Sequence, residues 1–189
     1  MKDYTQEIAA YMEREKQVMD AVSKNDLSLV MNLLEEARKD GRQIFIMGNG
    51  GSAATASHYV CDFNKGVSMN QKRRYRFICL NDNIPTLMAY ANDVSYDDIF
   101  VAPLQNYYRE GDVVLGISGS GNSRNVVKAM EWAKEHHAVT IAFTGYDGGN
   151  LKQIARYGVH IPVMDMQITE DLHMMLDHCM MQILCQETE

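Results

Sequence analysis

Short apolar runs alternate with helical segments along most of the chain. Five of these runs are almost wholly apolar, which is typical of strands buried on both faces of a sheet. They lie at residues 43–47, 77–80, 113–117, 139–143 and 159–163. Residues at helical spacing, such as Val126, Met130 and Ala133, separate the runs, and a last helix is predicted over residues 169–186. This alternation predicts right-handed βαβ units and therefore an α/β fold, a three-layer α/β/α sandwich around a parallel five-stranded sheet.

Two further helices are predicted before the first of these runs. One spans about residues 4–23, and the other ends at Gly41 and has Asn25 or Asp26 as a candidate cap. They have no obvious place on the sheet, so their apolar stripes could pack against another subunit. We therefore predict a single domain over residues 1–189, divided into a helical extension at 1–40 and an α/β core at 41–189.

Composition and charge argue against several classes of protein. The formal net charge of −7 does not favour general nucleic-acid binding, which relies on clustered Lys and Arg. No apolar run approaches the ~20 residues needed to cross a membrane, and the charged N-terminal segment lacks the pattern of a signal peptide. The four cysteines form no C-x-x-C pair, and we expect them to be reduced. We therefore expect a cytoplasmic protein with neither nucleic-acid nor membrane partners.

Two loops rich in glycine and serine each follow a predicted strand, at residues 48–54 and 118–123. In open parallel sheets, ligands bind at the carboxyl ends of the strands. Glycines let successive N–H groups approach an anion, and serine hydroxyls can donate to phosphate oxygens. The helix that follows each loop adds partial positive charge at its N-terminus. The pair of loops therefore favours a phosphate site.

The alternative for either loop alone is a flexible turn between a strand and a helix. A nucleotide site is not favoured. No lysine follows the glycines in the manner of a Walker loop, and the first loop does not have the spacing G-x-G-x-x-G of a dinucleotide site. Two such loops in one sheet make the turn alternative less favoured than a phosphate site.

The two loops resemble the paired signatures of sugar isomerase (SIS) domains, and more narrowly those of the phosphoheptose isomerase branch. The similarity continues through residues 91–93 with Tyr96, through residues 144–149, and through residues 170–173 with His178. It covers nearly the whole chain, including the two leading helices. The resemblance implies a flavodoxin-like SIS fold with N-terminal helices that serve oligomerisation. It also implies a homotetramer whose active sites lie at subunit boundaries.

The resemblance implies that the loops bind a sugar phosphate. The serines that hold the phosphate in this branch match Ser52, Ser118, Ser120 and Ser123, and Asn49 matches a residue that meets the sugar. The predicted substrate-binding set is completed by Gly50, Gly51, Asn92, Asp93, Gly119 and Glu170.

The activity implied by the resemblance is aldose–ketose isomerisation through an enediol, most obviously of sedoheptulose 7-phosphate to a D-glycero-heptose 7-phosphate. The catalytic carboxylate and histidine match Asp62 and His178. His58, Asp62, Glu170 and His178 match the divalent-metal site, usually occupied by zinc, which accepts imidazole and carboxylate ligands. From spacing alone, the i,i+4 pair His58 and Asp62 could instead be a surface interaction, and His173 could take the place of His178.

Four positions depart from the pattern of the family. Asp62 replaces the usual Glu and is one methylene shorter, which reduces its reach by about 1.5 Å. Glu170 replaces the usual Gln and adds a negative charge, which should strengthen binding of a cation. The two changes together could be a compensated rearrangement of one site. Gly119 stands in place of a Thr, and Gln167 stands where an acidic sugar contact is common.

Two other functions fit the same residues. Some SIS relatives are adaptors, such as the bacterial protein that associates with the replication initiator DnaA, and an adaptor could keep the loops and lose the chemistry. The presence of His58, Asp62, Glu170 and His178 favours the enzyme, because an adaptor has no need of four such groups. The sequence also leaves open the isomerisation of another sugar phosphate, such as a pentose or hexulose phosphate.

Overall fold

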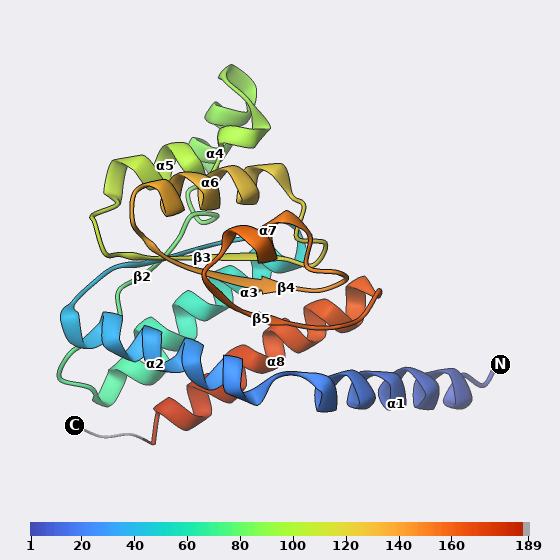
Figure 1. Ribbon diagram of the computed structural model, residues 1–189. Helices are drawn as coiled ribbons and strands as arrows, with labels where there is room; N and C mark the ends of the chain where they lie inside the picture. Colours follow the sequence, from blue (N-terminus) through green and yellow to red (C-terminus); the bar gives the residue numbers. More distant parts are fainter. Residues whose placement is uncertain (187–189) are drawn as a thin grey trace.

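Side chains along the central strands alternate between two separate cores, one on each face of the sheet. In the computed structural model, which describes residues 1–186, five parallel strands are hydrogen-bonded in the order β2-β1-β3-β4-β5 (Figure 1). The strands are β1 (Ile44–Met47), β2 (Phe77–Cys79), β3 (Val113–Ser118), β4 (Val139–Thr144) and β5 (Tyr157–His160). The prediction of a parallel five-stranded sheet is confirmed. The last strand begins at Tyr157, earlier than predicted, and it ends at His160, shortly before Pro162, which has no N–H with which to continue it.

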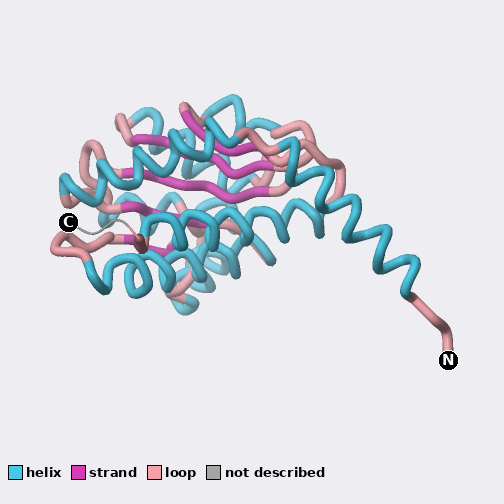
Figure 2. Tube along the Cα trace, turned by 90° about the horizontal axis from the view of Figure 1, so that it is seen from below, coloured by secondary structure: helices cyan, strands magenta, loops and turns pink. Residues whose placement is uncertain are grey.

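Helices cover both faces of the sheet. The first core joins the sheet to α2 (Lys24–Asp40), α3 (Gly51–Cys61) and α8 (Met166–Leu184). The second core joins it to α5 (Val101–Tyr107), α6 (Arg124–Glu135) and α7 (Gly149–Ile154). Ile44 and Ile46 enter the first core, whereas Phe45 and Met47 enter the second, as the period of two in a strand requires. The three-layer α/β/α sandwich is therefore confirmed, and Figures 1 and 2 show the two helical layers on either side of the strands.

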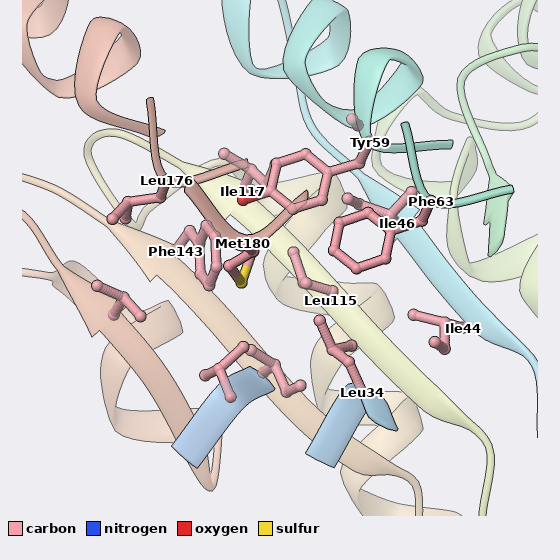
Figure 3. Packing of buried hydrophobic residues seen from close by; sticks show 14 of the residues in the cluster. Leu34, Ile44, Ile46, Tyr59, Phe63, Leu115, Ile117, Phe143, Leu176 and Met180 are labelled. Carbon is pink, nitrogen blue, oxygen red and sulfur yellow. The ribbon is translucent and has the colours of Figure 1, made fainter. Parts of the chain in front are cut away.

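The first core contains most of the large side chains. Figure 3 shows Tyr59 and Phe63 beside Leu115 and Ile46 of the sheet, with Met180 of α8 nearby. The rings of Tyr59 and Phe63 are stacked with centroids 5.8 Å apart. This packing fixes α3 and α8 against the sheet and against each other, so side chains at their shared edge have well-defined positions.

The two N-terminal helices differ in where they pack. The expectation that neither has a place on the sheet is wrong for α2, since Val30, Leu34 and Ala37 are fully buried in the first core. The predicted boundary at residue 40 therefore does not separate α2 from the core. Its cap is Ser23, whose hydroxyl accepts a hydrogen bond from the Asp26 N–H at 3.2 Å, rather than Asn25 or Asp26. Gly41 ends the helix in the left-handed conformation, as predicted.

Helix α1 (Thr5–Ala21) has no buried residue and extends away from the body of the molecule (Figures 1 and 2). It touches the start of α8, where Arg14 forms an ion pair with Asp165 at 2.6 Å and the Tyr11 hydroxyl donates to Asp171. Ile8 and Met12 are exposed to 53% and 62%. The helix thus has an apolar stripe that nothing within residues 1–186 covers.

Several short elements were not predicted. Helix α4 (Ile84–Asp93) and α5 occupy the connection between β2 and β3. Helix α3 continues into a π-helical turn at Asp62–Gly66, a rare feature that often occurs at functional sites. Across the described part of the chain, no helix is both long enough and apolar enough to span a membrane.

Candidate functional site

The two predicted phosphate loops follow the two adjacent strands at which the sheet reverses its order. Strands β1 and β3 are neighbours, and the chain continues from them to opposite sides of the sheet, to β2 and to β4. Helix α3 after β1 packs on one face, and α6 after β3 packs on the other. A crevice at the carboxyl end of such a pair of strands is where ligands bind in this kind of sheet.

An amide pair links the first loop to Asn125, in the first turn of the helix α6 that follows the second loop. Asn49 Nδ2 donates to Asn125 Oδ1 at 2.8 Å, and Asn125 Nδ2 donates back to Asn49 Oδ1 at 2.9 Å. The Tyr96 hydroxyl also donates to Asn49 Oδ1, at 3.2 Å. The first loop is therefore held to the start of α6, so the loops lie together as the sequence suggested. Asn92 and Asp93, in contrast, hydrogen-bond each other at the exposed end of α4, and their contact with a sugar stays a prediction.

Two glycines at the start of α3 shape the end of the first loop. Gly50 has a φ of +56°, a conformation that favours glycine, and it precedes the first turn of α3. A Cβ on Gly51 would lie 2.2 Å from Oε2 of Glu170, so the Glu170 carboxylate lies directly against the Gly51 backbone. Ser52 follows in the first turn and is buried.

The second loop places three serines around one turn of backbone. Ser118 Oγ donates to Ser123 Oγ at 3.2 Å, and Ser120 Oγ accepts a hydrogen bond from the Asn122 N–H at 3.2 Å. Ser123 occupies the cap position of α6, but its hydroxyl does not cap the helix. The turn packs tightly against the next loop, since a Cβ on Gly121 would lie 1.9 Å from the carbonyl oxygen of Gly148. The serine hydroxyls and the first turn of α6 can therefore present donors to an anion.

Three of the four predicted metal ligands come together at the edge between α3 and α8. His58 Nε2 lies 3.0 Å from His178 Nε2 and 3.6 Å from Asp62 Oδ2, and His178 Nε2 lies 4.0 Å from the same oxygen. Tetrahedral zinc with bonds of 2.0–2.1 Å has its ligand atoms about 3.4 Å apart. The observed separations bracket that value, so the three side chains fit a zinc-sized cation.

The fourth member of this group is Asp177, which the sequence did not indicate. One ligand atom from each of His58, Asp62, Asp177 and His178 lies within 4.8 Å of the others. Glu170, the predicted fourth ligand, is not part of the group. The only signal for Asp177 in the sequence was its place one turn after His173 on the apolar stripe of the last helix, where a charged residue is unexpected.

Asp177 is fully buried, and both of its carboxylate oxygens lack a hydrogen-bond partner among residues 1–186. Burial, followed by the nearby Asp62 charge, raises the pKa of the Asp177 carboxyl to about 8. The Tyr59 hydroxyl is likewise buried without a partner in the described structure. Burial, and then the charge of Asp177, raises the pKa of that phenol.

The other histidines lie outside this group. His173 is fully buried, with Nε2 3.4 Å from the carbonyl oxygen of Thr144. Burial lowers the pKa of His173 to about 4, so it is a neutral core residue at ordinary pH. His136 stacks on Trp132, and His160 lies 3.1 Å from the Thr144 hydroxyl. Of the two histidines that spacing alone allowed, His178 is therefore the one that lies beside His58 and Asp62, and His173 lies in the core.

Comparison with known proteins identifies the family of the chain. A profile of the SIS domain matches residues 3–145. The phosphoheptose isomerase of Citrifermentans bemidjiense is 36% identical over 187 residues, which cover 97% of this chain and 94% of that protein. That of Aquifex aeolicus is 36% identical over 160 residues, covering 85% and 81%. The solved structure of phosphoheptose isomerase from Neisseria gonorrhoeae has a TM-score of 0.87 at 28% identity, covering 96% of this chain and 98% of that one. The chain therefore belongs to the SIS domain family, in its phosphoheptose isomerase branch.

Proposed function

We propose that this protein is an aldose–ketose isomerase that converts sedoheptulose 7-phosphate to a D-glycero-heptose 7-phosphate through an enediol. The observation that carries the proposal is the arrangement at the carboxyl edge of β1 and β3. The Asn49–Asn125 amide pair joins the first loop there to the first turn of α6, which follows the second loop, and α3, which starts in the first loop, also carries His58. The proposed anion-binding loops and the proposed proton-transfer side chains are therefore held on one frame of strands and helices.

The phosphate is held by neutral donors in this proposal. Ser52, Ser118, Ser120 and Ser123 contribute hydroxyls, and the first turns of α3 and α6 contribute N–H groups and partial positive charge. These contacts orient the sugar and do not change during the reaction. They therefore contribute mainly to substrate binding and to the alignment of C1 and C2.

Proton transfer between C1 and C2 requires a base, and the hydroxyl protons require a second group. Asp62 and His178 are the proposed pair. The Asp62 carboxylate has two oxygens, so one can contact a cation while the other accepts a proton. His178 has two ring nitrogens, so one can bind the cation while the other takes part in proton transfer. A bound divalent ion would polarise the sugar carbonyl and stabilise negative charge on the enediolate.

Zinc is the proposed ion, because two imidazoles and carboxylates at these separations suit it. We also propose a homotetramer, supported by the uncovered stripe of Ile8 and Met12 on α1. A cytoplasmic location is supported by four free cysteines.

The test is to incubate the purified, zinc-supplied protein with sedoheptulose 7-phosphate and to follow the anomeric signals by NMR. The proposal predicts a growing aldose heptose 7-phosphate signal. A panel of ketose phosphates from C5 to C7 identifies the preferred sugar. No aldose from any of them, together with tight capture of a protein partner, would instead support the adaptor function.

A further inference from the structure

Asp177 is a carboxylate in a place where a carboxylate is costly. Its side chain is completely buried on α8 between Leu176 and His178, and neither oxygen has a hydrogen-bond partner within residues 1–186. A buried charge is normally paired, hydrogen-bonded or bound to a metal. A leucine or methionine at this position would suit the surrounding apolar stripe better. The presence of a carboxylate therefore indicates that it binds a partner.

The surroundings of Asp177 indicate what that partner is. Its ligand atom lies within 4.8 Å of those of His58, Asp62 and His178, which come from α3, from the start of the π-helical turn and from α8. Two of these neighbours are imidazoles, which bind cations when neutral, and the third is another carboxylate. Two carboxylates this close repel each other, and a divalent cation between them removes the repulsion.

Glu170 occupies a different place. It lies seven residues before Asp177 on α8, a rise of about 10 Å along the helix axis. Its carboxylate lies against the backbone of Gly51, at the start of α3. There it faces the first loop, and it does not belong to the group formed by the two histidines and Asp62.

We propose that Asp177, and not Glu170, completes the metal site of this protein, so that the ligand set is His58, Asp62, Asp177 and His178. The inference rests on the metal of the proposed function, and it changes which side chain binds it. Asp62 is one methylene shorter than the carboxylate usual in the family, and Asp177 supplies a second carboxylate from the buried side. Glu170 is then free to face the sugar.

Binding of Zn²⁺ to the metal-free protein without any sugar, measured by isothermal titration calorimetry, tests the assignment. Asp177→Asn has nearly the same shape and removes the charge, and Glu170→Gln is the matched control on the same helix. We expect Asp177→Asn to weaken Zn²⁺ binding by roughly 100-fold or more, since even loss of an outer-shell partner costs about 10–100-fold. We expect Glu170→Gln to change the affinity by less than about threefold. A large loss in Glu170→Gln with none in Asp177→Asn would overturn the assignment, and so would failure of the wild-type protein to bind Zn²⁺.

Thermal unfolding provides the second measurement, because it shows whether each variant folds. Without metal, Asp177→Leu should melt at or above the wild-type temperature, since it removes a buried carboxyl that lacks a hydrogen-bond partner, and Asp177→Asn should melt close to it. With saturating Zn²⁺, the wild type should gain several degrees more than either variant. Equal gains in all three proteins would contradict the proposal. Because neither readout uses a sugar, normal Zn²⁺ binding without isomerase activity would count against the proposed function alone.

Discussion

The site has two parts, the phosphate loops and the group of titratable side chains, and they differ in the kind of polar group that they use. The loops around Ser52 and Ser120 use backbone N–H groups, neutral hydroxyls and helix termini, and their turns contain Gly50 and Gly121 at positive φ. The group of His58, Asp62, Asp177 and His178 uses titratable side chains, two of them carboxylates within a few ångströms of each other. The loops are complete without their ligand, whereas the charged group has unsatisfied atoms until a proton or a cation arrives.

This contrast predicts that the two halves fail in different ways when they are altered. Loss of a loop hydroxyl should weaken substrate binding without changing the rate of the chemical step, because the contact is the same in the ground and transition states. Loss of a group that moves a proton should slow the chemical step and leave binding.

The largest effect is expected for the charged group. His178→Ala and Asp62→Ala should each lower kcat by roughly 10²–10⁴-fold, the usual contribution of general acid–base catalysis, with little change in KM. The measurement is steady-state turnover of sedoheptulose 7-phosphate. His137→Asn is the matched control, since His137 is exposed at the end of α6 with a φ of +63° that asparagine tolerates. Wild-type turnover in both alanine variants would show that Asp62 and His178 are not the proton-transfer pair.

The loop should respond through KM. Ser120→Ala removes a hydroxyl that is proposed to donate to the phosphate, and a hydrogen bond to a charged group stabilises by about 1.5–3 kcal/mol. We expect KM to rise roughly 10–100-fold with kcat nearly unchanged. Ser28→Ala, an exposed position on α2, is the control and should leave both constants as they are. If Ser120→Ala lowered kcat and left KM unchanged, the assignment of the loops to substrate binding and not to the chemical step would be wrong.

The strands and the two phosphate loops could be predicted from the sequence, because they depend on local patterns. The run at residues 113–117 is continuously apolar, and it predicted most of β3, while each loop follows such a run directly. Asp177 could not be identified, because spacing places it on a helix face but only packing shows that this face is buried beside His58. The docking of α2 was missed for the same reason, since its stripe looks like that of α1 until the sheet is in place.

The exposed stripe of α1 is proposed to hold the subunits of the tetramer together. Replacing Ile8 and Met12 of α1 by Glu puts charges on the exposed stripe without touching the core of the protomer. We expect the particle mass measured by light scattering to fall from that of a tetramer, by up to fourfold, with thermal stability of the protomer retained. The paired replacement Glu7→Gln and Glu13→Gln on the same helix should leave the mass unchanged. A protein that is monomeric before the change would rule out this role of α1.

The pH dependence of stability distinguishes the buried His173 on α8 from the functional residues near it. His173 lies one turn before Asp177 on the same buried face, and burial lowers its pKa to about 4 from an ordinary value of 6.5. Between these values the unfolded chain binds a proton that the folded protein does not. His173 therefore makes the free energy of unfolding decrease as pH falls from 6.5 to about 4, by at most about 1.4 kcal/mol per pH unit. Urea unfolding across this range should be less pH-dependent in His173→Gln than in wild type, whereas His136→Gln should match wild type.

The most direct test of the account is a crystal structure with sedoheptulose 7-phosphate bound. The account predicts that the phosphate lies between the two loops, within hydrogen-bond distance of the hydroxyls of Ser118, Ser120 and Ser123. It also predicts that C1 and C2 of the sugar lie beside Asp62 and His178. A phosphate bound elsewhere on the protein, with both loops empty, would contradict it.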